Sequence, residues 1–304
     1  MDTLHLRRSV IRCGGAGISS YTTNDSISNG NVKAVILAGG HGTRLSEETG
    51  VRPKPMVEIG GLPILWHIMK IYSTFGVHDF VICCGYKGHL IKDFFYTYHL
   101  RHSDVTIDLA SQDITFHRNG CEPWRVTLVD TGLATMTGGR IRRVAEWIGD
   151  EAFFLTYGDG VADVDLDALL RFHRSQKTLV TLTAVRPPGR FGAFSLRDEQ
   201  DQIAHFREKP TDGEDAWING GYFVVEPQAL SYIEDDSTTW EREPMERLAE
   251  EGQLSAYRHK GFWHPMDTLR DKMVLEELWN AGQAPWRVWL NMPAAASAGV
   301  DGTG

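Results

Sequence analysis

The sequence predicts an α/β protein in which helices cover both faces of a central, largely parallel sheet. Beyond residue 32, short apolar and β-branched runs alternate with amphipathic stretches of helical spacing. Several of the short runs are apolar at nearly every position, which is typical of strands that are buried on both faces. Strands that alternate with helices in this way form a sheet with helices packed on each side.

The expected elements follow in order along the chain. Strands are predicted at 33–37, 80–84, 125–129, 152–157 and 179–185, and helices between them at 63–75, 87–98, 138–148 and 165–176. Beyond residue 190 the pattern is less regular, with strands at 194–196, 203–207, 222–225 and 254–257 and helices at 241–251 and 268–279. We therefore expect a mixed, mostly parallel sheet with a small antiparallel extension.

The length of 304 residues allows one large α/β domain or two small ones. A single domain is expected at 32–290, because no internal repeat or low-complexity linker interrupts that range. Residues 1–31 are rich in Ser, Gly, Asn and Thr and lack the apolar core of a signal peptide, so they are predicted to be a disordered leader. Residues 291–304 are predicted to be a disordered tail.

Several global properties narrow the function. No segment approaches the roughly 20 apolar residues that span a bilayer, and the net charge of −9 disfavours nucleic acid or an anionic membrane as partner. The four cysteines lack CxxC spacing, and Cys83 and Cys84, adjacent in a predicted strand, should point to opposite faces as buried thiols. These observations predict a cytoplasmic protein.

A glycine-rich segment follows the first strand. It reads Leu37-Ala38-Gly39-Gly40-His41-Gly42-Thr43-Arg44-Leu45. Glycines permit a backbone whose N–H groups converge on an anion, and the planar guanidinium of Arg44 suits a polyphosphate. The segment is neither a dinucleotide fingerprint, because Leu45 stands at the third glycine position, nor a Walker loop. A plain glycine-rich turn remains the alternative for this segment alone.

A restrained lysine follows. Lys54 stands between Pro53 and Pro55, which hold the local backbone extended and give the ammonium a defined origin. With this lysine, the sequence resembles the sugar-phosphate nucleotidylyltransferases, whose signature is the glycine-rich segment above followed by Lys-Pro. The resemblance spans about residues 32–290.

Within that family the sequence is most similar to the glucose-1-phosphate cytidylyltransferases. The blocks that carry this similarity lie at 46–49, 80–88, 129–132, 136–140, 156–163 and 261–268. One departure is His41, at a position where the family often has a larger apolar residue. The resemblance implies a Rossmann-like nucleotidyltransferase fold.

The resemblance also implies the site residues. Arg44 and Lys54 would be catalytic, and Asp159 and Asp267 would bind Mg²⁺. The implied nucleotide-binding residues are Leu37, Ala38, Gly39, Gly40, His41, Gly42, Thr43, Thr135, Gly139, Arg140 and Gly158. The implied sugar-phosphate-binding residues are Glu208, Lys209, Asn219 and Gly220. Taken alone, the segments around Asp159, Glu208 and Asn219 are also compatible with turns, and Asp267-Thr268 with a helix cap.

The reaction that the resemblance implies joins CTP to glucose 1-phosphate and gives CDP-glucose and pyrophosphate. The resemblance also implies a homo-oligomer of six subunits. A uridylyl- or thymidylyltransferase on the same fold is the first alternative. A catalytically silent sugar-nucleotide sensor is the second. A dinucleotide-dependent oxidoreductase is the third, and the missing fingerprint disfavours it.

Overall fold

The computed structural model describes residues 32–42, 45–186, 193–196, 203–207 and 217–290. Within these ranges, the side chains of residues 46, 47, 118, 119, 193–196 and 203–207 are not described. The predicted leader at 1–31 and tail at 291–304 lie outside the described residues, as do Thr43, Arg44, Glu208 and Lys209.

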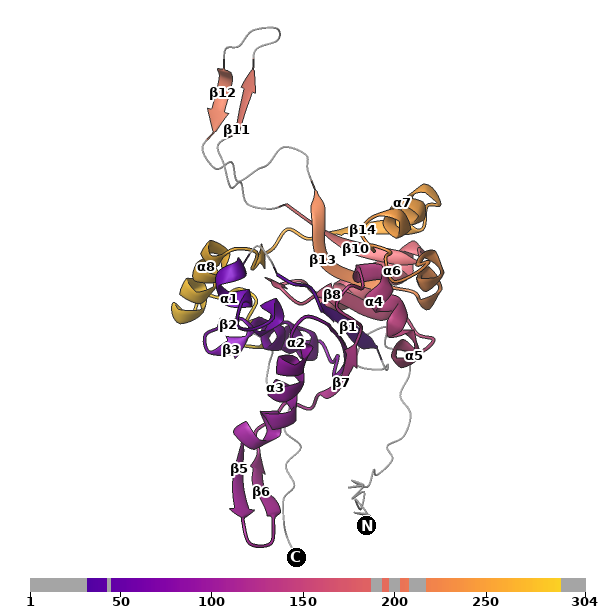
Figure 1. Cartoon of the computed structure of the whole chain (residues 1–304). Helices are drawn as coiled ribbons and strands as arrows, with labels where there is room; N and C mark the ends of the chain where they lie inside the picture. Colours follow the sequence, from indigo (N-terminus) through magenta and orange to yellow (C-terminus); the bar gives the residue numbers. More distant parts are fainter. Residues whose placement is uncertain (1–31, 43–44, 187–192, 197–202, 208–216, 291–304) are drawn as a thin grey trace, which may run out of the picture.

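In the described part of the chain, seven strands form one sheet in the order β14-β10-β13-β8-β1-β4-β7 (Figure 1). They are β1 (Lys33–Ala38), β4 (Asp79–Cys84), β7 (Arg125–Asp130), β8 (Phe153–Tyr157), β10 (Val180–Val185), β13 (Ile218–Val225) and β14 (Leu254–Arg258). β1 runs parallel to β4 and β8, β4 to β7, and β10 to β14, whereas β13 is antiparallel to both its neighbours. The prediction of a mixed, mostly parallel sheet is confirmed.

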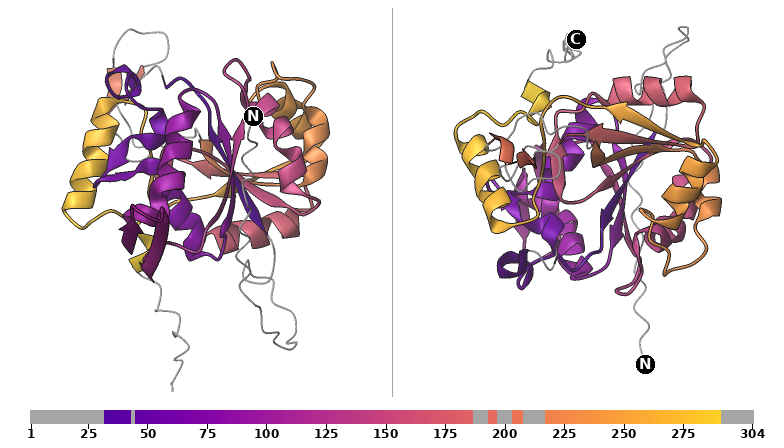
Figure 2. Two further views of the ribbon diagram at one scale, coloured as in Figure 1. Left: turned by 60° about the horizontal axis from the view of Figure 1, so that its bottom comes forward. Right: turned by 90° about the horizontal axis from the view of Figure 1, so that it is seen from above.

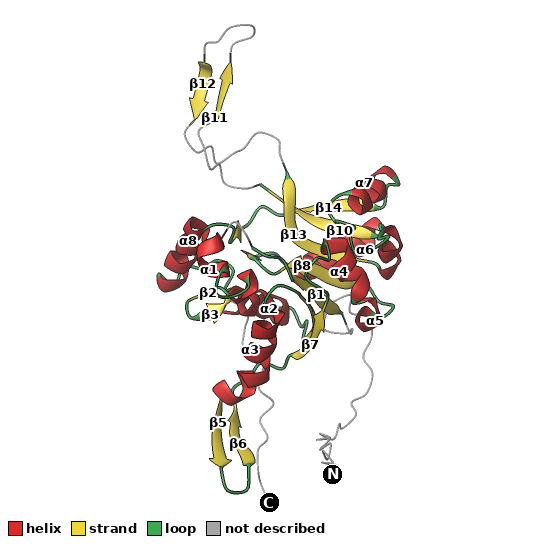
Figure 3. Cartoon of the chain, viewed as in Figure 1, coloured by secondary structure: helices red, strands yellow, loops and turns green. Residues whose placement is uncertain are grey.

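Helices cover both faces of this sheet, as Figures 2 and 3 show. One face packs against α2 (Ile64–Thr74), α3 (Gly88–Arg101), α6 (Leu166–Gln176) and α8 (Leu269–Asn280). The other packs against α4 (Thr137–Arg143), α5 (Ala145–Ile148) and α7 (Glu243–Glu250). Because successive strand residues point to opposite faces, Ile36 and Cys84 belong to the first core and Val35 and Cys83 to the second. The two adjacent thiols are therefore buried on opposite faces, as predicted.

The shorter elements connect these layers. They are α1 (Ser46–Thr49), η3 (Lys54–Met56), β2 (Glu58–Ile59), β3 (Leu62–Pro63), β9 (Gly160–Ala162), η4 (Pro227–Tyr232), β15 (Trp263–Pro265) and η5 (Val288–Leu290). The small antiparallel extension is the pair β11 (Ala193–Leu196) and β12 (Ile203–Arg207). It projects from the sheet beyond β13 (Figure 1).

One expectation about elements was wrong, and one hairpin was missed. The single helix predicted at 138–148 is interrupted at Val144, whose φ of −102° and ψ of 8° separate α4 from α5. The antiparallel hairpin of β5 (Ser103–Asp108) and β6 (Asp113–Asn119) was not predicted. Ile107 and Ile114 are 48% and 53% exposed, so the hairpin buries too little to leave a clear sequence pattern. Of the helices that the structure describes, none is both long and apolar enough to cross a membrane.

Candidate active site

A cavity of about 610 Å³ opens where β1, β7 and β8 end at one edge of the sheet. Its lining includes twelve residues that sequence reasoning assigned to the site: Leu37, Ala38, Gly39, Gly40, His41, Gly42, Lys54, Thr135, Arg140, Gly158, Asp159 and Asp267. The remaining lining residues are Pro55, Leu133, Ala134, Met136, Thr137 and Tyr157. The carboxyl end of a parallel sheet is where α/β folds commonly bind ligands, because the connecting loops converge there.

Two glycines of the loop after β1 are required for different reasons, one for its backbone conformation and one for close packing. Gly42 has a φ of +62°, a conformation that only glycine adopts readily, and Thr49 donates a hydrogen bond to its carbonyl over 3.1 Å. At Gly39, an added Cβ would lie 2.2 Å from Nη1 of Arg140. No atom of the described residues lies within 4 Å of a Cβ placed at Gly40, so among these residues the loop is open to a ligand there.

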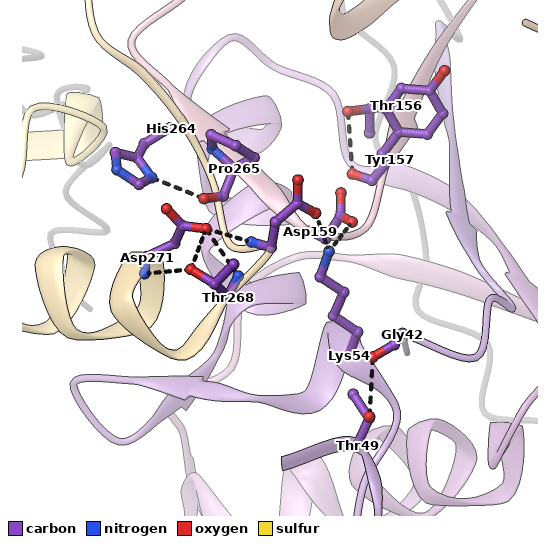
Figure 4. A network of polar contacts seen from close by, with 11 residues as sticks. Gly42, Thr49, Lys54, Thr156, Tyr157, Asp159, His264, Pro265, Thr268 and Asp271 are labelled. Atoms are coloured by element: carbon purple, nitrogen blue, oxygen red, sulfur yellow. Dashed lines mark hydrogen bonds and ion pairs between the residues drawn. The ribbon is translucent and has the colours of Figure 1, made fainter. Parts of the chain in front are cut away.

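Lys54 lies at the floor of the cavity in η3, its side chain 11% exposed. Its Nζ donates to Oδ2 of Asp159 over 2.6 Å and to Oδ1 of Asp267 over 2.7 Å, and Figure 4 shows the side chain extended toward Asp159. Burial by itself would lower the pKa of Lys54, but the charges and hydrogen bonds of the two carboxylates outweigh it and raise the pKa. Lys54 is therefore an ammonium ion at neutral pH.

The two aspartates are 108 positions apart in sequence, and strand pairing brings them together. β9 begins directly after Asp159 and pairs with β15, which ends two residues before Asp267. The amide of Met266 also donates to the carbonyl of Asp159 over 2.8 Å. Both carboxylates thus reach one point, the Nζ of Lys54.

This donor set suits a divalent cation. Mg²⁺ commonly binds one or two carboxylates and completes its shell with water and phosphate oxygens. Among the described residues, no group of three or more His, Cys, Asp and Glu could hold a metal ion. Two converging carboxylates could supply part of such a shell, and the assignment of Asp159 and Asp267 to Mg²⁺ stays a prediction.

A second cavity of about 250 Å³ adjoins the first. It contains the predicted sugar-phosphate residues Asn219 and Gly220, and it shares Tyr157, Asp159 and Asp267 with the larger cavity. The other predicted members of this group, Glu208 and Lys209, lie outside the described residues. The two cavities thus meet at the two carboxylates.

The structure gives Arg140 and Gly139 surroundings that the sequence did not suggest. Arg140, which the resemblance implied to bind the nucleotide, donates from Nη1 to Thr131 Oγ1 and the Gly132 carbonyl, each over 2.7 Å. Gly139, also implied to bind the nucleotide, is absent from the cavity lining, and a Cβ there would lie 2.6 Å from the Cα of Asp236. Their roles toward the nucleotide stay predictions.

Tyr157 is a site residue that sequence reasoning missed. It lines both cavities, and its hydroxyl donates to Glu241 over 2.6 Å and accepts from Nδ2 of Asn219 over 3.3 Å. Burial, and then the charge of Glu241, raise the pKa of Tyr157, so the phenol stays protonated. Its place at the end of a predicted strand, directly before Gly158-Asp159, was the signal that could have identified it.

Comparisons with known proteins identify the family of the chain. The family described as Nucleotidyl transferase matches residues 33–271. A glucose-1-phosphate cytidylyltransferase of Salmonella typhimurium is 59% identical over 259 residues, 85% of this chain and 100% of the relative. A probable glucose-1-phosphate cytidylyltransferase of Bacillus subtilis is 42% identical over 259 residues, which again cover 85% of this chain and 100% of the relative.

Solved structures share the fold at lower identity. HddC from Yersinia pseudotuberculosis, complexed with GMP-PN, has a TM-score of 0.60 and 22% identity, covering 82% of this chain and 99% of that one. A UDP-glucose pyrophosphorylase complexed with UDP-glucose has a TM-score of 0.59 and 16% identity, covering 83% and 99%. At these identities the likeness concerns the fold alone.

Proposed function

Since the chain belongs to the nucleotidyl transferase family, and within it to the glucose-1-phosphate cytidylyltransferases, we propose that it transfers a cytidylyl group from CTP to α-D-glucose 1-phosphate. The products are CDP-glucose and pyrophosphate. The observation that carries the proposal is that a large and a small cavity meet at Asp159 and Asp267, the two carboxylates to which Lys54 donates. Two substrates that bind in these cavities would bring their phosphates together at this point.

In the proposed reaction, a phosphate oxygen of the sugar attacks the α-phosphorus of CTP in line, and pyrophosphate leaves. That oxygen is ionised near neutral pH, so the enzyme needs no general base. Catalysis then depends on holding the two substrates in position and on neutralising their charge. Lys54 would bind the α-phosphate and the sugar phosphate. Mg²⁺ held by Asp159 and Asp267 would supply further neutralisation of the nucleotide phosphates.

The other residues of the site would bind the nucleotide in the larger cavity and the sugar phosphate in the smaller one. The loop from Leu37 to Gly42 lines the larger cavity, which supports binding of the nucleotide there through backbone N–H groups. Thr43 and Arg44 would extend that binding to the outer phosphates. Asn219 and Gly220 line the smaller cavity, where they would bind the sugar together with Glu208 and Lys209.

The deciding experiment measures pyrophosphate release from CTP, UTP, dTTP and GTP, each with glucose 1-phosphate and Mg²⁺. We expect CTP to give by far the highest kcat/KM. Preference for UTP or dTTP would replace the proposal with the uridylyl- or thymidylyltransferase alternative. Binding of CDP-glucose without pyrophosphate release from any nucleotide would indicate a silent sensor.

Two further properties belong to the proposal. We expect a homo-oligomer of six subunits, on the family resemblance, and sedimentation of the purified protein measures this directly. We also place the enzyme in the cytoplasm. The buried thiols of Cys83 and Cys84 fit a reducing compartment.

A further inference from the structure

The ammonium of Lys54 lies between the same two carboxylates that the proposed function assigns to a divalent cation. Its Nζ is 2.6 Å from Asp159 Oδ2 and 2.7 Å from Asp267 Oδ1, the lengths of charge-assisted hydrogen bonds. An ammonium and a divalent cation carry charge of the same sign, and both require the oxygens of these carboxylates. The two cations therefore compete for one pair of ligands.

We propose that Lys54 is the internal counter-ion of the cation site. In the substrate-free enzyme it neutralises Asp159 and Asp267, and it releases them when the phosphates of the nucleotide offer its ammonium another anion. The inference rests on the proposed function in one respect, the assignment of the cation to these carboxylates. As a consequence, the free enzyme binds divalent cations weakly and takes up the cation together with the nucleotide.

The surroundings of Lys54 support such an exchange. The backbone of η3 is held by Pro53 and Pro55, and the amide of Val57 donates to the carbonyl of Lys54, so the origin of the side chain is fixed. Lys54 also lines the larger cavity, together with Gly40, where no described atom would meet an added Cβ within 4 Å. The ammonium can therefore turn from the carboxylates toward a phosphate in this cavity without movement of the main chain.

The carboxylates would change little in the exchange. Asp159 is followed directly by paired strand β9, and the amide of Asp267 donates to Oδ2 of Asp271 in the first turn of α8. Both are therefore positioned by backbone contacts that do not involve Lys54. Removal of the ammonium should therefore increase the attraction of this carboxylate pair for a divalent cation.

The test measures Mn²⁺ binding to the substrate-free, full-length protein at pH 7.5, by the electron paramagnetic resonance signal of free Mn²⁺. Lys54→Met keeps the apolar stem and removes the charge. We expect it to bind Mn²⁺ at least about tenfold more tightly than the wild type, equivalent to about 1.4 kcal/mol. The matched control is Lys70→Met, which removes another partly buried lysine paired with a carboxylate, Glu122, and should bind Mn²⁺ as the wild type does.

Lys54→Met that binds Mn²⁺ no more tightly than the wild type would overturn the proposal. So would tight binding that survives in Lys54→Met/Asp267→Asn, because the cation would then use other ligands. Lys54→Gln gives the same comparison if Lys54→Met does not fold, and a larger Mn²⁺-induced rise in Tm for either variant is a second readout. The four-nucleotide assay on the wild type tests the proposed function separately, so the two failures are distinguishable.

Discussion

The guanidinium of Arg140 is buried at the base of the larger cavity and bonded to the loop that follows β7. Its Nη1 donates to Thr131 Oγ1 and to the carbonyl of Gly132, and the guanidinium also lies against Gly39. Burial lowers its pKa. One side chain therefore joins the loop after β1 to the loop after β7, and both loops line the cavity.

Arg140→Met should raise the KM for CTP about tenfold or more, because the carbonyls that Arg140 holds would lose charge-assisted donors. The KM for glucose 1-phosphate should change much less. Steady-state kinetics with each substrate varied in turn measure both values. Arg171→Met removes an exposed arginine of α6 and should change neither. An unchanged KM for CTP in folded Arg140→Met would contradict this role.

Tyr157→Phe should raise the KM for glucose 1-phosphate about fivefold, because one hydrogen bond of ordinary strength is lost on the sugar side. Its hydroxyl is the partner of Asn219, which lines the smaller cavity. Tyr98→Phe is the matched control, since that hydroxyl is also hydrogen-bonded, to Trp66 and Glu122, but lies away from both cavities. Equal effects of the two variants on this KM would refute the assignment.

At the scale of elements, the first turn of α8 both stabilises this helix and positions Asp267, one of the two carboxylates proposed to bind the cation. Thr268 caps the helix by accepting from the amide of Asp271, and the carboxylate of Asp271 accepts in return from the amides of Thr268 and Asp267. This capping box fixes the backbone of Asp267 (Figure 4 shows the Thr268–Asp271 contacts).

Thr268→Ala should cost about 1 kcal/mol of unfolding free energy and raise the Mg²⁺ concentration needed for half-maximal turnover. Urea unfolding and a Mg²⁺ titration of the activity measure the two effects. Asp165→Ala removes the corresponding cap of α6, which accepts from Ala168 over 2.8 Å. It should cost similar stability and leave the Mg²⁺ requirement unchanged, whereas a shared Mg²⁺ effect would argue against the link to Asp267.

A second element, α2, contains a buried histidine that makes stability depend on pH. His67 is fully buried, and its Nε2 is 2.9 Å from the carbonyl of Ile59. Burial lowers the pKa of His67 to about 4, although the hydrogen bond to Ile59 by itself raises this pKa. The folded protein therefore keeps His67 neutral, whereas the unfolded chain takes up a proton below about pH 6.5.

The contribution of His67 to stability is present above about pH 6.5 and is lost as the pH falls toward 4. We expect it to lower the unfolding free energy by on the order of 1 kcal/mol per pH unit in that interval. Urea unfolding between pH 7.5 and 4.5 should show a shallower pH dependence for His67→Gln than for the wild type. The exposed His89→Gln on α3 should keep the wild-type slope. Identical slopes for all three proteins would exclude this effect.

At the scale of the whole molecule, the larger cavity joins loops that are far apart in sequence, so a ligand there should stabilise the entire fold. CTP with Mg²⁺ at about 100 times its Kd should add about 2.7 kcal/mol to the unfolding free energy. Thermal unfolding with each of the four nucleotides measures this, and CTP should give the largest rise in Tm. Equal rises with all four would show that the cavity does not select the base.

The sequence alone allowed the prediction of the central sheet and most of its helices, because strands buried on both faces and amphipathic helices leave periodic patterns. It also placed the glycine-rich loop and Lys54, since local backbone restraint by glycine and proline is encoded in neighbouring residues. The exposed β5–β6 hairpin left no such pattern, and the break at Val144 depends on how α4 and α5 pack against the second core.

Only the tertiary structure decided which side chains meet. Nothing local to Asp159 or Asp267 indicates that the ammonium of Lys54 bonds to both, because the pairing of β9 with β15 creates that convergence. Nor does the sequence show that Arg140 turns to the loop after β7, or that Tyr157 borders both cavities. Contacts between residues that are far apart in sequence depend on how the whole chain packs. Patterns of burial and backbone restraint depend on neighbouring residues and can therefore be predicted from the sequence.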